Sequence, residues 1–262
     1  MLLSSVILVL REILEAALIV SILLVFSRQL ALSGRWIGTA LVVGLLGATI
    51  YAARIGEVSD WFGYVGQEVV NATMQLILCG LVAAFILLLY RQRRRALSWL
   101  MALVLVLSLT REGSEILIYY SGFLHQPELL APVLLGGGLG TGIGLSAGAL
   151  LYYGLMALRP LYRQRLSLVL LALFGGNMVS QATLLLIQAD WLPAGGAVWD
   201  SSTYLPDQSV VGQLLYALVG YEATPSGLQT AGYLGATAVL LFLQWPFWRP
   251  SSEPRLSQAL KP

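Results

Sequence analysis

Long apolar stretches, separated by short polar ones, run through almost the whole chain. Each stretch is close to the ~20 residues that an α-helix needs to cross the apolar core of a bilayer. The pattern therefore predicts an all-α, polytopic membrane protein with seven transmembrane helices. We expect these helices at residues 3–27, 36–54, 67–90, 97–120, 132–157, 166–189 and 226–247.

The region between the sixth and seventh predicted helices is the longest one that does not cross. It contains an apolar piece at 210–219 that is too short to span a membrane, and we expect it to form an interfacial or re-entrant helix. Residues 1–248 are predicted to form a single transmembrane domain, and residues 249–262 a short cytoplasmic tail.

The basic residues indicate the orientation of the helices. If the seven helices alternate in direction, 12 of the 15 lysines and arginines fall on one side of the membrane. Cytoplasmic loops carry such an excess, so the N-terminus is predicted to lie outside and the C-terminus in the cytoplasm. The outer side carries mostly acids, including Glu68 and Glu222. An acidic surface attracts cations, although acids in outer loops are also compatible with simple solvation.

The composition agrees with a membrane protein. Of 262 residues, 58% are hydrophobic and 11% are charged, whereas soluble domains contain about 25% charged residues. The mean hydropathy is +0.79. The single cysteine, Cys79, excludes an internal disulfide. We expect membrane lipid as the environment and no nucleic-acid partner, and the pattern leaves open whether the chain forms a homo-oligomer.

A charged motif occurs twice inside the predicted transmembrane helices. Residues 11–15 read Arg-Glu-Ile-Leu-Glu, and residues 111–115 read Arg-Glu-Gly-Ser-Glu. An ionised residue at that depth costs about 2.5–3.5 kcal/mol on insertion scales, so such groups neutralise one another, face water or bind an ion. The two acids of each motif lie on one helix face. Two helices meeting along these faces would surround one point with four carboxylates, those of Glu12, Glu15, Glu112 and Glu115.

The repeat extends to a second pair of helices. Asn71 and Gln75 are four residues apart in the third predicted helix, and Asn177 and Gln181 have the same spacing in the sixth. Three crossings in each repeat make the two copies inverted, a plan that places polar sites near mid-membrane at their interface. The four amides either line such a site or bond helices together. The expected parts are a first repeat at about 1–95, a second at about 96–190, an outer loop at about 190–225 and a last helix at about 226–247.

Four carboxylates, with no histidine, cysteine or methionine in either motif, favour a hard cation such as ferric or ferrous iron, manganese, magnesium or calcium. The two motifs sum to −2 when fully ionised, which a divalent or trivalent ion would nearly neutralise. Without an ion, we expect Arg11 to pair with Glu15 and Arg111 with Glu115. The alternative is that the motifs only hold helices together, but an excess of buried acids is poorly suited to that role.

The doubled Arg-Glu-x-x-Glu motif resembles that of the oxidase-dependent iron permeases, also called the iron/lead permease family. The resemblance covers the whole chain and includes the runs 67–71 and 220–226. It implies high-affinity iron uptake across the plasma (inner) membrane, with the four motif glutamates binding iron in transit. It also implies an extracytoplasmic iron oxidase or iron-delivery protein as partner.

Two positions depart from the usual pattern of that family. Ile13 stands where members commonly have glycine, and Asn71 stands where they often have an acid. Glu68, one turn away from Asn71, is the expected substitute for that acid. Glu222 is either an outer ligand or a solvated loop acid.

Two other functions stay open. One is a carrier for a different cation, such as manganese, lead or protons. The other is a membrane di-iron oxidase, but such centres normally include Glu-x-x-His motifs, and the single histidine, His125, falls in a predicted loop. We therefore expect a transporter rather than an enzyme, with iron as the transported substrate and no resident cofactor.

Overall fold

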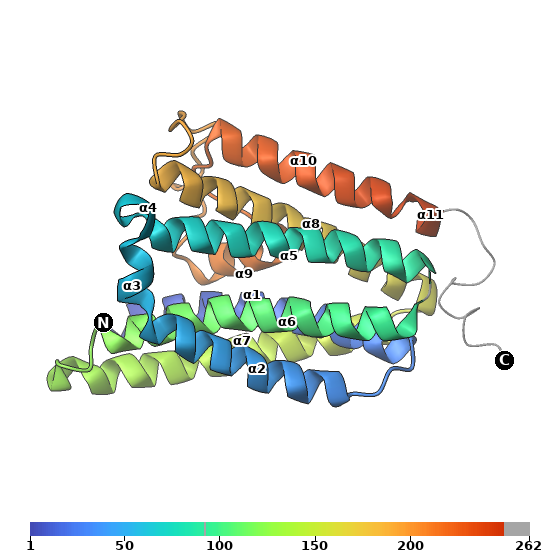
Figure 1. Cartoon of the computed structure of the whole chain (residues 1–262), viewed down its shortest axis with the longest axis horizontal. Helices are drawn as coiled ribbons and strands as arrows, with labels where there is room; N and C mark the ends of the chain where they lie inside the picture. The colour runs from blue at the N-terminus through green and yellow to red at the C-terminus, as the bar shows by residue number, and fades with distance from the viewer. Residues whose placement is uncertain (92, 249–262) are drawn as a thin grey trace.

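The computed structural model describes residues 1–91 and 93–248; the tail predicted at 249–262 lies outside the described residues. Within the described part, the regular structure is α-helical apart from one isolated antiparallel bridge between Ala197 and Ser226, so the all-α prediction is confirmed (Figure 1). The helices are α1 (Leu2–Gln29), α2 (Arg35–Ala53), α3 (Ile55–Ser59), α4 (Trp61–Tyr64), α5 (Gly66–Arg91), α6 (Arg94–Ser121), α7 (Pro127–Ala157), α8 (Pro160–Gln188), α9 (Val210–Val219), α10 (Gly227–Leu243) and α11 (Trp245–Trp248).

Local signals in the sequence explain several helix ends. Pro127 and Pro160 lie in the first turns of α7 and α8. Amides of the first turn have no partner within the helix, so proline costs no hydrogen bond there. Ser226 and Gln229 form a capping box at the start of α10. Each of the seven predicted helices corresponds to one long helix, and the short helix predicted at 210–219 is present as α9.

Four helices, α2, α5, α7 and α8, are long and apolar enough to cross a membrane. α1 and α6 have 28 residues each and carry the charged motifs near their middles, and a crossing needs only ~20 residues. α10 is apolar and has 17 residues. The protein is thus a multi-pass integral membrane protein. Seven crossings and the orientation of the termini stay predictions.

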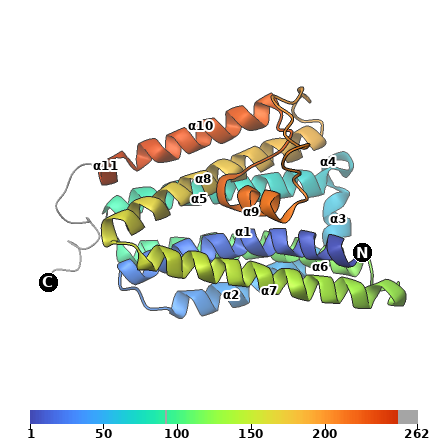
Figure 2. The same cartoon turned by 180° about the vertical axis from the view of Figure 1, so that it is seen from behind.

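The most extensive helix contacts join α1 to α7 and α2 to α6, and both views show these helices side by side (Figures 1 and 2). α7 faces α1 with glycines at every fourth position. A Cβ atom added at Gly140 would lie 2.6 Å from the carbonyl oxygen of Val6, and one at Gly136 would lie 2.5 Å from that of Leu2. The glycine spacing therefore permits close packing of the two backbones.

α2 presents a corresponding stripe of small residues to α6. Its buried residues recur every four positions and include Ala40, Gly44 and Ala48. A Cβ atom at Gly44 would lie 2.8 Å from the Cβ of Leu109 in α6. The first helix of each predicted repeat thus packs against the second helix of the other. The remaining long helices complete the bundle, with α8 packed between α5 and α10.

A large apolar core fills the bundle on one side of the charged motifs. Most of its buried side chains come from α1, α5, α6 and α8. In α1 the core begins at Leu18, after Glu15, and in α6 its buried residues end at Leu105, before Arg111. Phe26 and Phe85 pack edge to face within it, with ring centroids 5.3 Å apart. The motifs therefore lie at the edge of an apolar and closely packed interior.

Candidate metal site

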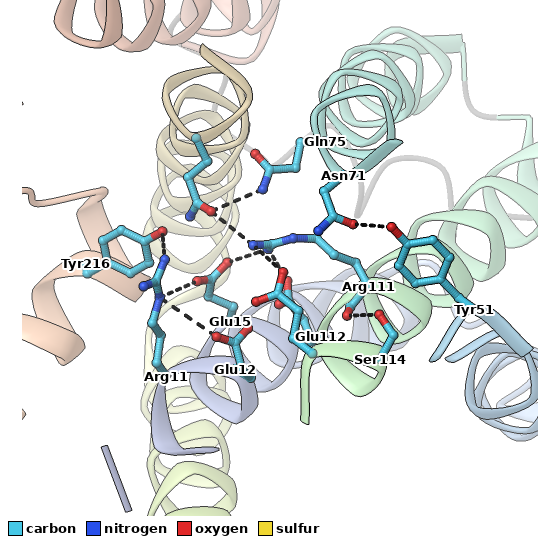
Figure 3. Close-up of polar contacts among 12 residues, drawn as sticks. Arg11, Glu12, Glu15, Tyr51, Asn71, Gln75, Arg111, Glu112, Ser114 and Tyr216 are labelled. Carbon is cyan, nitrogen blue, oxygen red and sulfur yellow. Dashed lines mark hydrogen bonds and ion pairs between the residues drawn. The ribbon is translucent and has the colours of Figure 1, made fainter. Parts of the chain in front are cut away.

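The two charged motifs meet where α1 and α6 pass each other in the middle of the bundle (Figure 3). Glu12, Glu15 and Glu112 are almost fully buried, with exposed fractions of 3%, 1% and 2%. Glu115 is partly exposed, with 29% of its side chain accessible. One carboxylate oxygen from each of Glu12, Glu112 and Glu115 lies within 4.8 Å of the other two. Three of the four predicted ligands thus surround a common point.

Arg111 is the central cation of this site. Its Nη1 lies 2.6 Å from Oε1 of Glu112 and 3.2 Å from Oε2 of Glu15, which belongs to the other motif. Its Nη2 lies 3.3 Å from Oε1 of Glu115. The predicted pair of Arg111 with Glu115 is therefore present, but the guanidinium also joins the two helices. Figure 3 shows Arg111 pointing into the space between the acids.

Arg11 occupies a different position, although it is the equivalent residue of the first motif. Its Nε is 3.7 Å from Oε1 of Glu15 and 4.0 Å from Oε1 of Glu12, so the predicted pair with Glu15 forms only a loose contact. Its Nη2 instead donates a hydrogen bond to the hydroxyl of Tyr216, and its guanidinium carbon is 4.2 Å from the centroid of the Tyr216 ring. Tyr216 belongs to α9, which packs on α1.

Two of the predicted amides bind one another at the edge of the acid cluster. Nε2 of Gln75 donates to Oε1 of Gln181 at 3.1 Å, and the same oxygen accepts a hydrogen bond from Nη2 of Arg111 at 3.1 Å. The amides of α5 and α8 therefore support the position of Arg111. Asn71 accepts a hydrogen bond from the hydroxyl of Tyr51 at 3.1 Å. Asn177 is buried near Gly220, at the end of α9.

Several buried oxygens of the cluster have no hydrogen-bond partner among the described residues. They are Oε2 of Glu12, Oε1 of Glu15 and Oε2 of Glu112. A buried polar atom without a partner costs about 1–3 kcal/mol, and more when it is charged. With two arginines against four glutamates, the site has both the spare ligand oxygens and the excess negative charge that suit a hard cation.

A cavity of about 340 Å³ connects this cluster with the end of the bundle where α1 and α5 begin and α6 and α8 end. Glu12 and Glu115 form its floor, and Glu68, Asn71 and Gln67 line its wall. The other lining residues are Leu8, Ile118, Tyr119, Leu185 and Gln188. The four helices that supply this lining are the first and third of each predicted repeat, so the cavity lies at the interface of the repeats.

The structure bonds the predicted residue Glu222 outside the acid cluster and adds two residues that sequence reasoning missed. Oε2 of Glu222 accepts a hydrogen bond from Gln229 at 2.8 Å, beside the start of α10. Tyr51 and Tyr216 were not predicted. For Tyr216 a sequence signal existed, because it and Gln213 are the only residues of the apolar α9 with polar groups in their side chains. Tyr51 carried no comparable signal within α2.

Comparisons with known proteins give one consistent result. No protein-family model matches the chain, and no solved structure does. Proteins named ferrous iron permease EfeU, from Escherichia coli O157:H7 and from Shigella sonnei (strain Ss046), are each 25% identical over 243 residues, which cover 85% of this chain and 87% of the relative. The relative of that name from Escherichia coli O6:H1 is 25% identical over 244 residues, with 85% of this chain and 88% of the relative covered. The chain is therefore a homologue of the ferrous iron permeases named EfeU, and the resemblance to the oxidase-dependent iron permease family, predicted from its repeated motif, is confirmed.

Proposed function

We propose that the protein carries iron into the cell through the site formed by its two Arg-Glu-x-x-Glu motifs. The observation that carries this proposal is the meeting of Glu12, Glu112 and Glu115 within 4.8 Å of one another, in the middle of a membrane protein whose relatives are named iron permeases. Glu15, bound to Arg111 in the ion-free site, is the fourth ligand. All-oxygen coordination of this kind suits ferrous and ferric ions.

Iron reaches the site through the cavity between the four glutamates and the end of the bundle where α1 and α5 begin. The N-terminus is outside in this proposal, so the cavity faces the extracytoplasmic side. Glu68 and the partly exposed Glu115 receive the ion first, and Glu12 lies at the cavity floor. Carboxylates lining a narrow space raise the local concentration of cations. An extracytoplasmic iron oxidase or iron-delivery protein would supply iron at this end, and the plasma (inner) membrane is the expected location.

Arg111 stands in for the cation while the site is empty. Its guanidinium neutralises the carboxylates that the ion needs, with contacts of 2.6–3.3 Å to three of them. An arriving ion takes over these oxygens, and Arg111 keeps its hydrogen bond to Gln181. The exchange avoids leaving uncompensated charge in the membrane, which would be strongly unfavourable. It also means that the measured affinity for iron includes the free energy of displacing Arg111.

Release to the cytoplasm requires the opposite half of the bundle to open. In the structure that half is filled by the apolar core, which comes mostly from α1, α5, α6 and α8, whereas Glu12 and Glu115 line the cavity at the other end of the bundle. The reciprocal packing of α1 on α7 and of α6 on α2 supports seven crossings with two inverted three-helix repeats. Rocking of such repeats about a central site is a general transport plan.

Uptake of radiolabelled iron by cells expressing Glu12→Gln, Glu112→Gln or Glu115→Gln tests the proposal. Each change removes one charged ligand and keeps its volume. We expect uptake to fall by more than about tenfold, which is the effect of removing a residue that only supports a metal ligand. Glu57→Gln is the matched control, because Glu57 is an exposed acid paired with Arg54. Unchanged uptake in all three variants, at equal expression, would refute the proposal.

A carrier for another hard cation is the remaining alternative, since oxygen ligands alone do not select iron over manganese. Competition by manganese and lead during the uptake measurement distinguishes the two. We expect iron to be taken up in the presence of a tenfold excess of manganese, as an order-of-magnitude criterion for metals of similar ligand preference. If manganese and lead, each at the same concentration as iron, inhibit iron uptake equally, the alternative is favoured.

A further inference from the structure

The two arginines of the repeated motifs have different partners, and the difference comes from α9. Arg111 contacts three carboxylates directly. Arg11 has carboxylates within 3.7–4.0 Å of its Nε, but its Nη2 is bonded to Tyr216. The predicted repeats contain no counterpart of α9 beside Arg111, because this helix lies in the loop after the second repeat.

We propose that Tyr216 is a positioning residue that holds Arg11 off the carboxylates and thereby leaves ligand oxygens free for the metal ion. The inference rests on the proposed function and concerns how the same site is kept ready for iron. Arg11 would otherwise compete with the ion, as Arg111 does. With Tyr216 in place, the ion has to displace only the guanidinium of Arg111 and not that of Arg11 as well.

The anchoring of α9 makes Tyr216 a fixed partner for Arg11. Ser209 caps its start by accepting a hydrogen bond from the amide of Gly212 at 2.9 Å. Gln213 donates to the carbonyl oxygen of Asp207 at 2.5 Å. At the other end the chain turns at Gly220, whose φ of 69° favours glycine. The helix is therefore held at both ends and through side-chain contacts with the preceding loop.

Packing fixes the same helix against α1, next to the first motif. Ala217, the neighbour of Tyr216, belongs to a buried apolar cluster with Leu10, which precedes the first motif, and Leu14, which lies between its two acids. Tyr216 makes two contacts with Arg11, one through its hydroxyl and one through its ring face. The side chain of Arg11 is 38% exposed, although its Nε is buried, and the face of an aromatic ring attracts a guanidinium at this distance. Both contacts hold the guanidinium on the α9 side.

Without Tyr216, Arg11 would reach the carboxylates of Glu12 and Glu15, whose Oε1 atoms lie 4.0 and 3.7 Å from its Nε. Oε1 of Glu15 and Oε2 of Glu12 have no hydrogen bond among the described residues. A small rotation of Arg11 would bring its guanidinium from 3.7–4.0 Å into hydrogen-bond distance of these carboxylates. Charge-assisted hydrogen bonds of this kind are the strong ones, so the ion would bind less tightly. Tyr216 thus sets the affinity of the site rather than supplying a ligand.

Binding of Fe²⁺ to the purified full-length protein, measured anaerobically by calorimetry, tests this inference. Tyr216→Phe removes the hydroxyl acceptor and keeps the ring, and we expect the dissociation constant to rise about tenfold, the effect of one added charge-assisted hydrogen bond to the carboxylates. Tyr216→Leu removes both contacts and is expected to have a larger effect. Tyr221→Phe is the control, since Tyr221 bonds Ser201 and the carbonyl of Leu205 in the loop and does not contact the motifs.

The Arg11→Gln background separates positioning from packing. There Tyr216→Phe has no charge to release, so we expect it to leave the dissociation constant of the Arg11→Gln protein unchanged. An equal loss of affinity in both backgrounds, or no loss in the wild-type background, would overturn the inference. Glu12→Gln in the same titration distinguishes a failure of the role of Tyr216 from a failure of the proposed function. If it abolishes Fe²⁺ binding while Tyr216→Phe has no effect, only the role of Tyr216 fails; if it leaves binding intact, the proposed function fails.

Discussion

Replacing Arg111 by glutamine tests how the empty site is stabilised. Arg111 is 3% exposed and lies 2.6, 3.2 and 3.3 Å from oxygens of Glu112, Glu15 and Glu115. Removing one partner from a buried ion pair costs about 3–5 kcal/mol, because the remaining charge stays buried without compensation. We therefore expect Arg111→Gln to lower the free energy of unfolding of the metal-free protein by about that amount.

The same substitution should increase the stabilisation by metal. A bound ligand raises the free energy of unfolding by about 2.7 kcal/mol at a concentration of 100 Kd. In the wild-type protein the ion has to displace Arg111, whereas in Arg111→Gln it meets free carboxylates. If the variant binds tenfold more tightly, metal at the same concentration adds about 1.4 kcal/mol more stability than it adds to the wild type.

Unfolding in mixed micelles, with and without Fe²⁺ under anaerobic conditions, measures both effects. Arg54→Gln is the matched control, because the ion pair of Arg54 with Glu57 is 64% and 66% exposed at a distance of 2.8 Å, and exposed pairs contribute only about 0–1 kcal/mol. The reasoning is refuted if Arg111→Gln is no more destabilising than Arg54→Gln. It is equally refuted if Fe²⁺ stabilises the variant no more than the wild-type protein.

Two further predictions concern the fold. Gly140→Val should separate α7 from α1, because the added Cβ would lie 2.6 Å from a carbonyl oxygen of α1. Such overpacking should lower the free energy of unfolding by about 1–3 kcal/mol. Gly138→Val is the control and should change the thermal midpoint little, because nothing lies within 4 Å of its Cβ position. For the topology, single cysteines introduced at Glu57 and at Tyr162 in a Cys79→Ser background should react with a membrane-impermeant maleimide from opposite sides of the membrane, and labelling of both from one side would contradict the predicted orientation.

Hydrophobic length and motif spacing were sufficient to predict the main features of the fold. Each apolar run of membrane-spanning length became one long helix, and the piece too short to cross became α9. The structure adds the close contact of α7 with α1, at glycines that recur every four residues. The two motifs meet, as expected for equivalent positions of pseudo-symmetric repeats. The helical turns α3 and α4 were not predicted, since both are short and α4 contains left-handed residues such as Phe62, with φ 54°.

The symmetry of the motifs did not predict the asymmetry of the site. Equal spacing suggested that each arginine pairs with its own motif. Arg111 does so but also contacts Glu15 of the other motif, and Arg11 bonds Tyr216. The cause is α9, which lies after both repeats in the chain and contacts α1. Its position depends on tertiary packing and on the path of the loop from 190 to 209, neither of which has a periodic signal in the sequence.

A crystal structure of the protein with bound iron, with an anomalous difference map that locates the metal, tests the central claim most directly. The account predicts an anomalous peak between Glu12, Glu112 and Glu115, at about 2.0–2.6 Å from their carboxylate oxygens, as for hard cations bound by oxygen. It also predicts that Arg111 has withdrawn from at least one of the carboxylates that it contacts without metal. A peak elsewhere in the protein, with Arg111 still bound to Glu15, Glu112 and Glu115, would contradict the account.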